Sequence, residues 1–231
     1  MRIELFDDDI GAVEYVSHMG SDLTVVNAAR VSFAVEKDVL DKKDEKLIKY
    51  LLEHNHTSPF EHCAVTMRFT VPLYIRSQHH RHRTWAYNEI SRRYTGVDMK
   101  FYQPTAFRTQ HLSNRQASNS EWINPTLSGL INGYDSASDA VRQHHTLSMA
   151  LYNSMIDAGV CREQARGVLP QNLYTQYYGT VNLHNLYKFI QLRLHEGAQW
   201  EIQKVAEACL EIAKSKFPIC TKFYKEIKGI K

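Results

Sequence analysis

The densest group of chemically active side chains lies between Gln78 and Arg93, and its residue types point to anion binding. Arginine stays charged at any working pH, so neighbouring arginines repel one another unless an anion lies among them. A phosphate is the best match, because a guanidinium pairs its forked donors with phosphate oxygens. The cationic or potentially cationic members of this stretch are Arg81, Arg83, Arg92, Arg93, His79, His80 and His82.

Other side chains of the same stretch add a second kind of recognition. Ser91 is a neutral donor, and Glu89 either orients the arginines or accepts hydrogen bonds from a ligand. Trp85, Tyr87 and Tyr94 offer flat surfaces for a heterocycle. We therefore predict a site for a phosphorylated heterocyclic compound. The alternatives are a solvated basic surface and a non-catalytic protein that binds single-stranded nucleic acid.

Arg193 is a candidate functional residue outside this stretch. It follows Leu186, Phe189 and Ile190 at helical spacing, so the pattern puts a guanidinium on an apolar stripe. A buried charge needs a partner. The spacing alone leaves two partners open, an intramolecular carboxylate or a ligand. Arg166, near a helix break, is uninformative by itself.

Several other chemistries are disfavoured. The histidines at 54, 56, 62, 79, 80 and 82 do not predict a metal site, because the nearby arginines oppose a bound cation. The four cysteines form no C-x-x-C pair, which fits a reducing cytoplasm. The sequence has no G-x-S-x-G elbow and no glycine-rich phosphate loop. Side chains must therefore hold any phosphate.

The elements that position these residues alternate between helices and strands. Val65, Met67, Phe69 and Val71 point to one face of a strand that begins near Cys63 and ends at Pro72. A second strand is expected over Leu173–Val181. We predict helices over Asp41–His54, Leu73 to about Arg83, Ala140–Ala158, Cys161–Leu169, Asn182 to about Glu196, and Ala198–Phe217. Residues from about 103 to 138 show no clear periodicity, and we predict that they form a long irregular excursion.

Composition limits the class of protein. The 231 residues are 43% hydrophobic and 23% charged, which excludes a disordered chain. A formal charge of +3 is too weak to predict general binding of nucleic acid. There is no apolar run long enough for a membrane span. We expect a cytoplasmic α+β protein with a mixed sheet packed with helices, forming a single elaborated catalytic domain over 1–231.

RHRTWAYNEISRR, residues 81–93, resembles the signature of the flavin-dependent thymidylate synthases, roughly R-H-R-x-x-S-x-N-E-x-S-x-R. Further similar stretches are NAARVSF, HTSPFEH, ARGVLPQNLYT, VNLHNLYKFIQLR and AQWEI. The resemblance implies an enzyme, a homotetramer with active sites at subunit interfaces. It would convert dUMP to dTMP with FAD, NADPH and methylenetetrahydrofolate. A related flavoenzyme that acts on another pyrimidine nucleotide is a further alternative.

The resemblance also implies roles for individual residues. Arg193 would be catalytic, at the pyrimidine edge. The dUMP contacts would be Gln78, Arg81, Glu89, Ser91, Arg92, Arg93, Arg166 and Arg193. The FAD contacts would be Ser32, Ser58, Glu61, Arg81, His82, Arg83, Glu89, Asn182, His184 and Lys188. His56 and Tyr94 would lie near the folate. Ala86 stands where the signature commonly has Ser.

Overall fold

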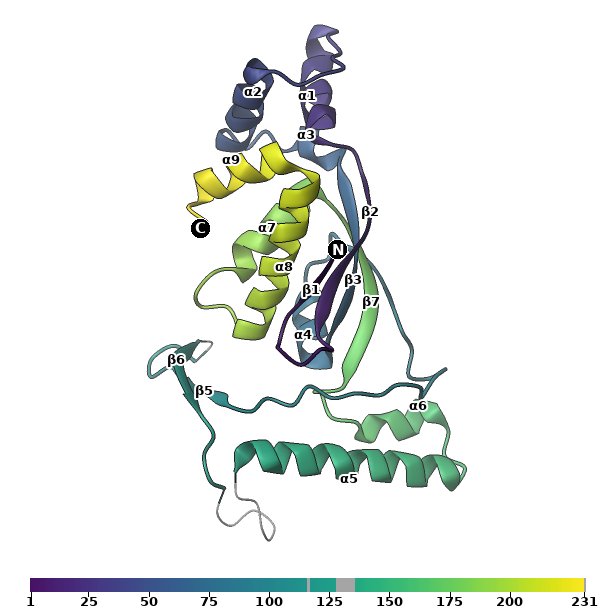
Figure 1. Ribbon diagram of the computed structural model, residues 1–231. Coiled ribbons are helices and arrows are strands. Elements are labelled where there is room, and N and C mark those ends of the chain that lie inside the picture. Colours follow the sequence, from purple (N-terminus) through teal and green to yellow (C-terminus); the bar gives the residue numbers. More distant parts are fainter. Residues whose placement is uncertain (116, 128–135, 231) are drawn as a thin grey trace. The chain divides into compact units, whose positions relative to one another are not determined.

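The protein is described here by a computed structural model that covers residues 1–115, 117–127 and 136–230 (Figure 1). The chain divides into two compact units. The first unit contains Met1–Phe69, Gln78–Asn88 and Tyr177–Lys231, and the second contains Thr70–Ser77 and Glu89–Gln176. The single catalytic domain expected over 1–231 stays a prediction.

Strands and helices alternate along the described residues. The strands are β1 (Arg2–Glu4), β2 (Ala12–Met19), β3 (Ala64–Pro72), β4 (Ala86–Glu89), β5 (Phe107–Gln110), β6 (Ser118–Ile123) and β7 (Tyr174–Asn182). The helices are α1 (Asp22–Arg30), α2 (Lys42–Glu53), α3 (Ser58–Glu61), α4 (Leu73–His79), α5 (Ala137–Asp157), α6 (Arg162–Ala165), α7 (Leu183–Arg193), α8 (Trp200–Lys216) and α9 (Pro218–Lys228). The predicted α+β class is confirmed.

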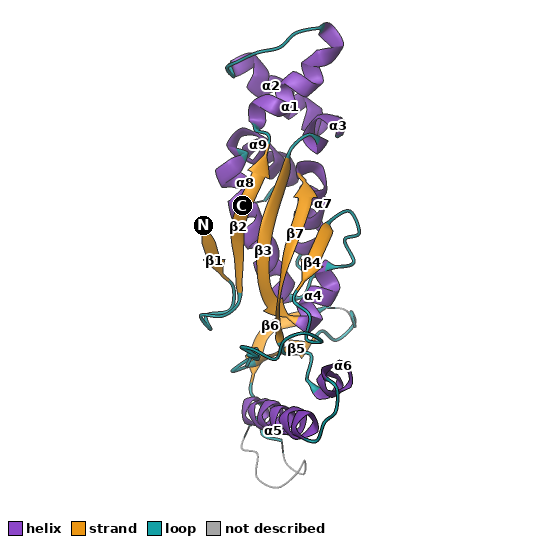
Figure 2. Cartoon of the chain, turned by 90° about the vertical axis from the view of Figure 1, so that its right-hand side faces the viewer, coloured by secondary structure: helices purple, strands orange, loops and turns teal. Residues whose placement is uncertain are grey.

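The main sheet has the strand order β1-β2-β3-β7-β4 (Figure 2). β1 and β2 pair antiparallel, with Arg2 opposite Glu14. Backbone hydrogen bonds beyond the ends of β3 and β7, Leu183 N to Cys63 O at 2.8 Å and Leu73 N to Leu173 O at 3.0 Å, show that these strands also run antiparallel. The apolar side chains of β3 alternate with polar ones and are buried, as the sequence predicts.

Helices α7 and α8 cover one face of the strands of the first unit (Figure 1). Ile202, Val205, Cys209 and Ile212 form an apolar stripe along α8, and all are fully buried. α9 begins at Pro218. Proline is favourable in the first turn of a helix, where its missing N–H would have no helical partner. The buried Asp22 accepts hydrogen bonds from the N–H groups of Ile219 at 3.0 Å and Cys220 at 2.9 Å. The sequence analysis missed this helix.

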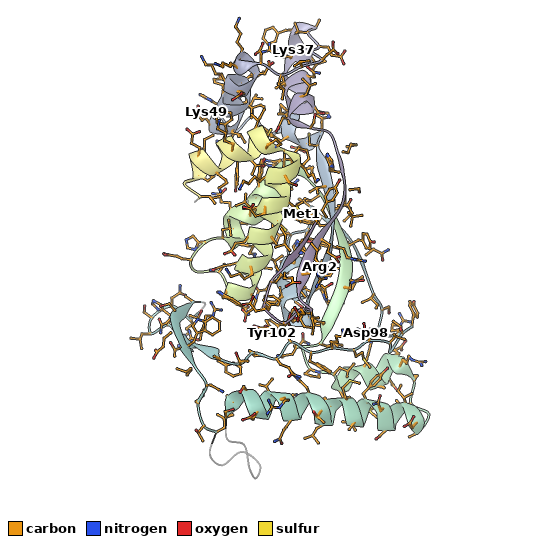
Figure 3. The ribbon with its side chains drawn as sticks, viewed as in Figure 1. Met1, Arg2, Lys37, Lys49, Asp98 and Tyr102 are labelled. Atoms are coloured by element: carbon orange, nitrogen blue, oxygen red, sulfur yellow. The ribbon has the colours of Figure 1, made fainter. Side chains whose placement is uncertain are left out.

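A buried carboxylate links α1 and α2 in the first unit. Asp44 on α2 is fully buried and lies 2.7 Å from Nη2 of Arg30 at the end of α1. It also pairs with Lys37, which lies in the connection between the two helices (Figure 3). A buried charge is tolerated only with partners, so this network fixes the connection in which Ser32 lies.

The second unit has its own apolar cluster. Tyr152 on α5 packs with Ala165, Leu169 and Leu173. Leu147 and Leu151 of α5 follow the same helical spacing as Met155, but they are exposed, whereas Met155 packs against this cluster.

The excursion expected over 103–138 is more regular than predicted. Residues 107–123 contain an antiparallel hairpin, β5 with β6, and α5 begins at Ala137. Polar composition hides this pairing, because neither strand has a buried face. Residues 116 and 128–135 of the excursion lie outside the described residues. No helix in the described part of the chain combines the length and apolar character that a membrane span needs.

Candidate functional site

A cavity of about 570 Å³ in the second unit brings together residues from six segments. In sequence order these are α4, the end of β4, the turn after it, the 3-10 helix Arg166–Val168 that follows α6, the connection from Leu169 to Leu173, and β7. The polar side chains that line the cavity are Arg76, Glu89, Ser91, Arg92, Gln171, Thr175 and Arg166. The backbone N–H of Ile90 donates to the carbonyl of Gln176 at 2.9 Å, which aligns the end of β4 with β7. Glu89, Ser91, Arg92 and Arg166 of the predicted dUMP set therefore share one cavity.

The charge of this cavity suits an anion. Arg76, Arg92 and Arg166 contribute positive charge to its lining, against the single carboxylate of Glu89. A phosphate monoester carries between one and two negative charges at neutral pH, and guanidinium groups bind it with paired donors. The described lining residues thus fit a phosphorylated ligand.

Arg92 is the most constrained of these arginines. Its Nη1 donates to the carbonyl of Val97 at 2.8 Å, and Nη2 lies 3.5 Å from the carbonyl of Tyr174. Its Nε is buried and has no hydrogen-bond partner in the described chain. Burial lowers the pKa of Arg92. The guanidinium is thus held in place before a ligand arrives, with one donor still to be satisfied.

Glu89 is held by two residues that the sequence analysis did not select. Thr175 Oγ1 donates to Glu89 Oε1 at 2.6 Å, and Arg76 Nε lies 3.2 Å from the same oxygen. Thr175 is buried on β7, and Arg76 is on α4. Arg76 could have been selected from the sequence, because it is a charged residue on the predicted helix immediately before the basic stretch. Nothing in the pattern of β7 distinguished Thr175.

Arg93 and Tyr94 lie outside the lining of the cavity. Arg93 Nη2 is 3.2 Å from Oε2 of Glu163, and its guanidinium lies 5.7 Å from the ring centre of Tyr94. The Tyr94 side chain is 78% exposed. The predicted ligand contacts of these two residues stay predictions.

In the first unit, Arg193 contacts His82. Nε of Arg193 donates to Nε2 of His82 at 3.0 Å, and among the described residues no carboxylate pairs with this arginine. Burial and the nearby Arg193 charge lower the pKa of His82 to about 4. The imidazole is therefore neutral at pH 7 and can accept from the guanidinium. The predicted helical stripe is correct, since Leu186, Phe189 and Ile190 are fully buried.

The basic stretch itself is partly core. His79 is fully buried, and its Nδ1 lies 2.8 Å from the hydroxyl of Tyr177. Burial lowers its pKa well below the usual value, so it adds no positive charge at neutral pH. Trp85 is only 6% exposed and packs on Phe69, so the prediction that it offers a surface to a heterocycle is wrong.

Tyr87 contacts the turn that follows α4. Its hydroxyl donates to the carbonyl of His79 at 2.8 Å and lies 3.2 Å from the carbonyl of His82. The same two carbonyls also accept backbone N–H groups three residues ahead, His79 O from His82 at 2.9 Å and His82 O from Trp85 at 3.4 Å, so the chain continues in tight turns rather than in an α-helix. α4 ends at His79, and the prediction that it continues to about Arg83 is wrong. Arg81 and Arg83 lie exposed in the turn that follows.

Three residues predicted for FAD or folate meet in a second cavity, of about 260 Å³, in the first unit. His56, His184 and Lys188 line it, together with Phe60 and Tyr187. Burial is the main cause that lowers the pKa of His184, and the charge of Lys188 adds to it. Imidazole and ammonium donors beside aromatic rings suit a cofactor with phosphates and a flat ring.

The remaining predicted cofactor and nucleotide residues of the first unit do not line this second cavity. Asn182 caps α7 and accepts from the N–H of Asn185 at 2.9 Å. Ser58 and Glu61 are exposed on α3, and Ser32 donates to the carbonyl of Ala29 at 3.2 Å. Gln78 hydrogen-bonds Gln199.

The fold and the cationic cavity define an α+β protein suited to a phosphorylated heterocyclic ligand, and comparison with known proteins identifies its family. Residues 14–219 match the family described as thymidylate synthase complementing protein. The chain is 39% identical over 218 residues to the flavin-dependent thymidylate synthase of Thermus thermophilus, covering 94% of this chain and 77% of that protein. It is 40% identical over 219 residues to that of Thermotoga neapolitana, covering 94% and 91%. The chain belongs to the flavin-dependent thymidylate synthase family.

Solved structures agree with this result. The UMP/dUMP methylase PolB from Streptomyces cacaoi, bound with 5-Br dUMP, is 31% identical with a TM-score of 0.80. The match covers 97% of this chain and 97% of that one. The same enzyme bound with 5-Br UMP matches at 30% identity and a TM-score of 0.75.

Proposed function

We propose that this protein is a flavin-dependent thymidylate synthase, a methyltransferase that converts dUMP to dTMP. The observation that supports it most directly is the cavity of the second unit. Three arginines line it beside Glu89 and Ser91, and their positive charge suits a phosphate group. In this proposal Arg92 and Arg166 bind the nucleotide phosphate, and Ser91 donates to it. Gln78, Arg81, Glu89, Arg93 and Arg193 complete the proposed contacts with dUMP.

Arg193 is the proposed catalytic residue. Methylation at C5 requires electron density at that carbon, and a guanidinium at the N3–C4–O4 edge of the pyrimidine stabilises the enolate-like charge that results. The contact with neutral His82 holds Nε of Arg193. The two terminal nitrogens have no carboxylate partner in the described chain. This supports a role in which those nitrogens meet the pyrimidine.

The cysteines support a route without a thiol nucleophile. Cys63, Cys209 and Cys220 are buried. Burial raises the pKa of each, that of Cys63 to about 11, so these thiols stay protonated at neutral pH. Cys161 is exposed and is not among the residues that line the cavity. The proposed reaction therefore uses no cysteine to attack C6 of the pyrimidine.

FAD is the proposed cofactor, with NADPH and methylenetetrahydrofolate as co-substrates. The donor set of the second cavity, His184 and Lys188 beside Tyr187, fits a flavin nucleotide, and His56 lies there for the folate. The proposed FAD contacts also include Ser32, Ser58, Glu61, Arg81, His82, Arg83, Glu89 and Asn182, and Tyr94 is proposed near the folate. When bound, the reduced flavin supplies the hydride of the reaction. We further propose a cytoplasmic homotetramer with active sites at subunit interfaces.

A second candidate substrate is UMP. The observation in its favour is the similarity to PolB, whose name states that it methylates both UMP and dUMP.

The experiment that tests the proposal is product analysis with purified protein. dTMP should form from dUMP when the flavin-loaded protein is supplied with NADPH and methylenetetrahydrofolate. Its yield should fall to background when either co-substrate is omitted or when the flavin has been removed from the protein. Bound flavin should bleach with NADPH. A colourless protein that cannot be reconstituted with FAD and that binds oligonucleotides would support the nucleic-acid alternative instead.

A further inference from the structure

Glu89 presents two different oxygens to its surroundings. Both contacts of its carboxylate fall on Oε1, the hydrogen bond from Thr175 at 2.6 Å and the ion pair with Arg76 at 3.2 Å. Oε2 has no hydrogen-bond or ion-pair partner in the parts of the chain that the structure describes. Glu89 lines the cavity, and its side chain is 24% exposed. One oxygen is therefore held by the protein, and the other remains an acceptor.

The chemistry of an acceptor restricts what Oε2 can bind. A carboxylate repels a phosphate and accepts hydrogen bonds only from donors. In the proposed function, Arg193 takes the N3–C4–O4 edge of the pyrimidine. Glu89 is a proposed contact of both dUMP and FAD. The donor that remains on dUMP is its 3′-hydroxyl, which is the only free hydroxyl of its sugar.

We propose that Arg76 and Thr175 are positioning residues that hold Glu89 so that Oε2 accepts a hydrogen bond from the 3′-hydroxyl of the nucleotide. This inference rests on the proposed function. Thr175 is 4% exposed on β7, and Arg76 approaches from α4, so two different elements fix the carboxylate. Holding an acceptor in advance lowers the entropy lost when a ligand binds.

Arg76 itself lines the cavity, so a direct contact with the phosphate is the competing role. The two roles differ in the part of the ligand that they recognise. If Arg76 acts through Glu89, its replacement changes the preference for a nucleotide with a 3′-hydroxyl. If Arg76 binds the phosphate, its replacement weakens the binding of all nucleotide monophosphates equally.

The test compares the binding of dUMP and 2′,3′-dideoxyuridine monophosphate to the flavin-loaded enzyme. A hydrogen bond to a charged group predicts that the wild type prefers dUMP by about 10- to 100-fold. Thr175→Val and Arg76→Leu should each reduce this preference to about threefold or less. Thr175→Ser keeps the hydroxyl and should restore it.

Thr180→Val is the matched control. Thr180 lies on the same strand, where its hydroxyl is 2.9 Å from that of Thr66, and it does not line the cavity. This variant should keep the wild-type preference. Adding Thr175→Val to Glu89→Gln should cause no further loss, because both changes remove the same contact.

Separate outcomes contradict the inference and the proposed function. An unchanged preference in Thr175→Val and Arg76→Leu, with normal dUMP binding by the wild type, overturns the inference alone. An equal loss of both nucleotides in Arg76→Leu assigns Arg76 to the phosphate and also overturns it. A wild type that binds neither nucleotide contradicts the proposed function.

Discussion

Replacing Arg92 tests the phosphate site where the structure is most constrained. The guanidinium is fixed by contacts with the carbonyls of Val97 and Tyr174, and its buried Nε has no partner in the described chain. A charge-assisted contact contributes about 1.5–3 kcal/mol. Arg92→Ala should therefore weaken dUMP binding by about 10- to 150-fold. Arg92→Lys should give an intermediate loss, because it keeps the charge but not the fork of donors.

The assay is isothermal titration of each variant with dUMP and with deoxyuridine. Deoxyuridine lacks the phosphate, so its affinity should stay the same in Arg92→Ala. Arg142→Ala is the control for net charge, since Arg142 pairs with Asp139 on α5 and does not line the cavity. Equal losses for dUMP and deoxyuridine would refute the assignment, because they would indicate a collapsed cavity. Unchanged dUMP affinity would refute it too.

Three further changes have defined outcomes. Arg193→Ala should lower turnover about 10²- to 10³-fold in steady-state assays, with flavin content unchanged by absorbance; loss of flavin would reassign the residue. Burial lowers the pKa of His145 to about 4 from 6.5, so the unfolded chain binds more protons between these values and stability falls as pH falls through that window. In urea unfolding, His145→Phe should remove about 2 kcal/mol of the loss between pH 7 and pH 5; an unaltered pH dependence would contradict this. A Cβ on Gly179 would lie 2.9 Å from Phe69, so Gly179→Ala should cost about 1–3 kcal/mol in urea unfolding. Gly167→Ala, with nothing within 4 Å of its added Cβ, should cost much less, and equal costs would refute the packing argument.

Periodicity predicted the elements that have one buried face. The alternation around Phe69 located β3, and the apolar stripe that ends at Arg193 located α7. Both patterns reflect burial against the rest of the fold, which sequence spacing records directly. The hairpin of β5 and β6 was missed because its side chains are not fully buried and leave no such pattern.

The site was predicted in part. Glu89 and Arg92 could be selected because an uncommon density of charge marks their stretch of sequence. Arg76 and Thr175 were not selected, since their importance comes from a contact with Glu89 across 13 and 86 positions of sequence. His79 has the type of a site residue, but it is buried among aromatic rings and belongs to the core. Residue type alone could not distinguish these cases.

Release of tritium from [5-³H]dUMP tests the central claim most directly, because methylation at C5 must expel the hydrogen at that carbon. We predict tritium release in step with dTMP formation when FAD, NADPH and methylenetetrahydrofolate are present, and strongly reduced release from Arg193→Ala. If the wild-type protein carries FAD and binds dUMP but releases no tritium with the complete set of co-substrates, the protein is not a thymidylate synthase.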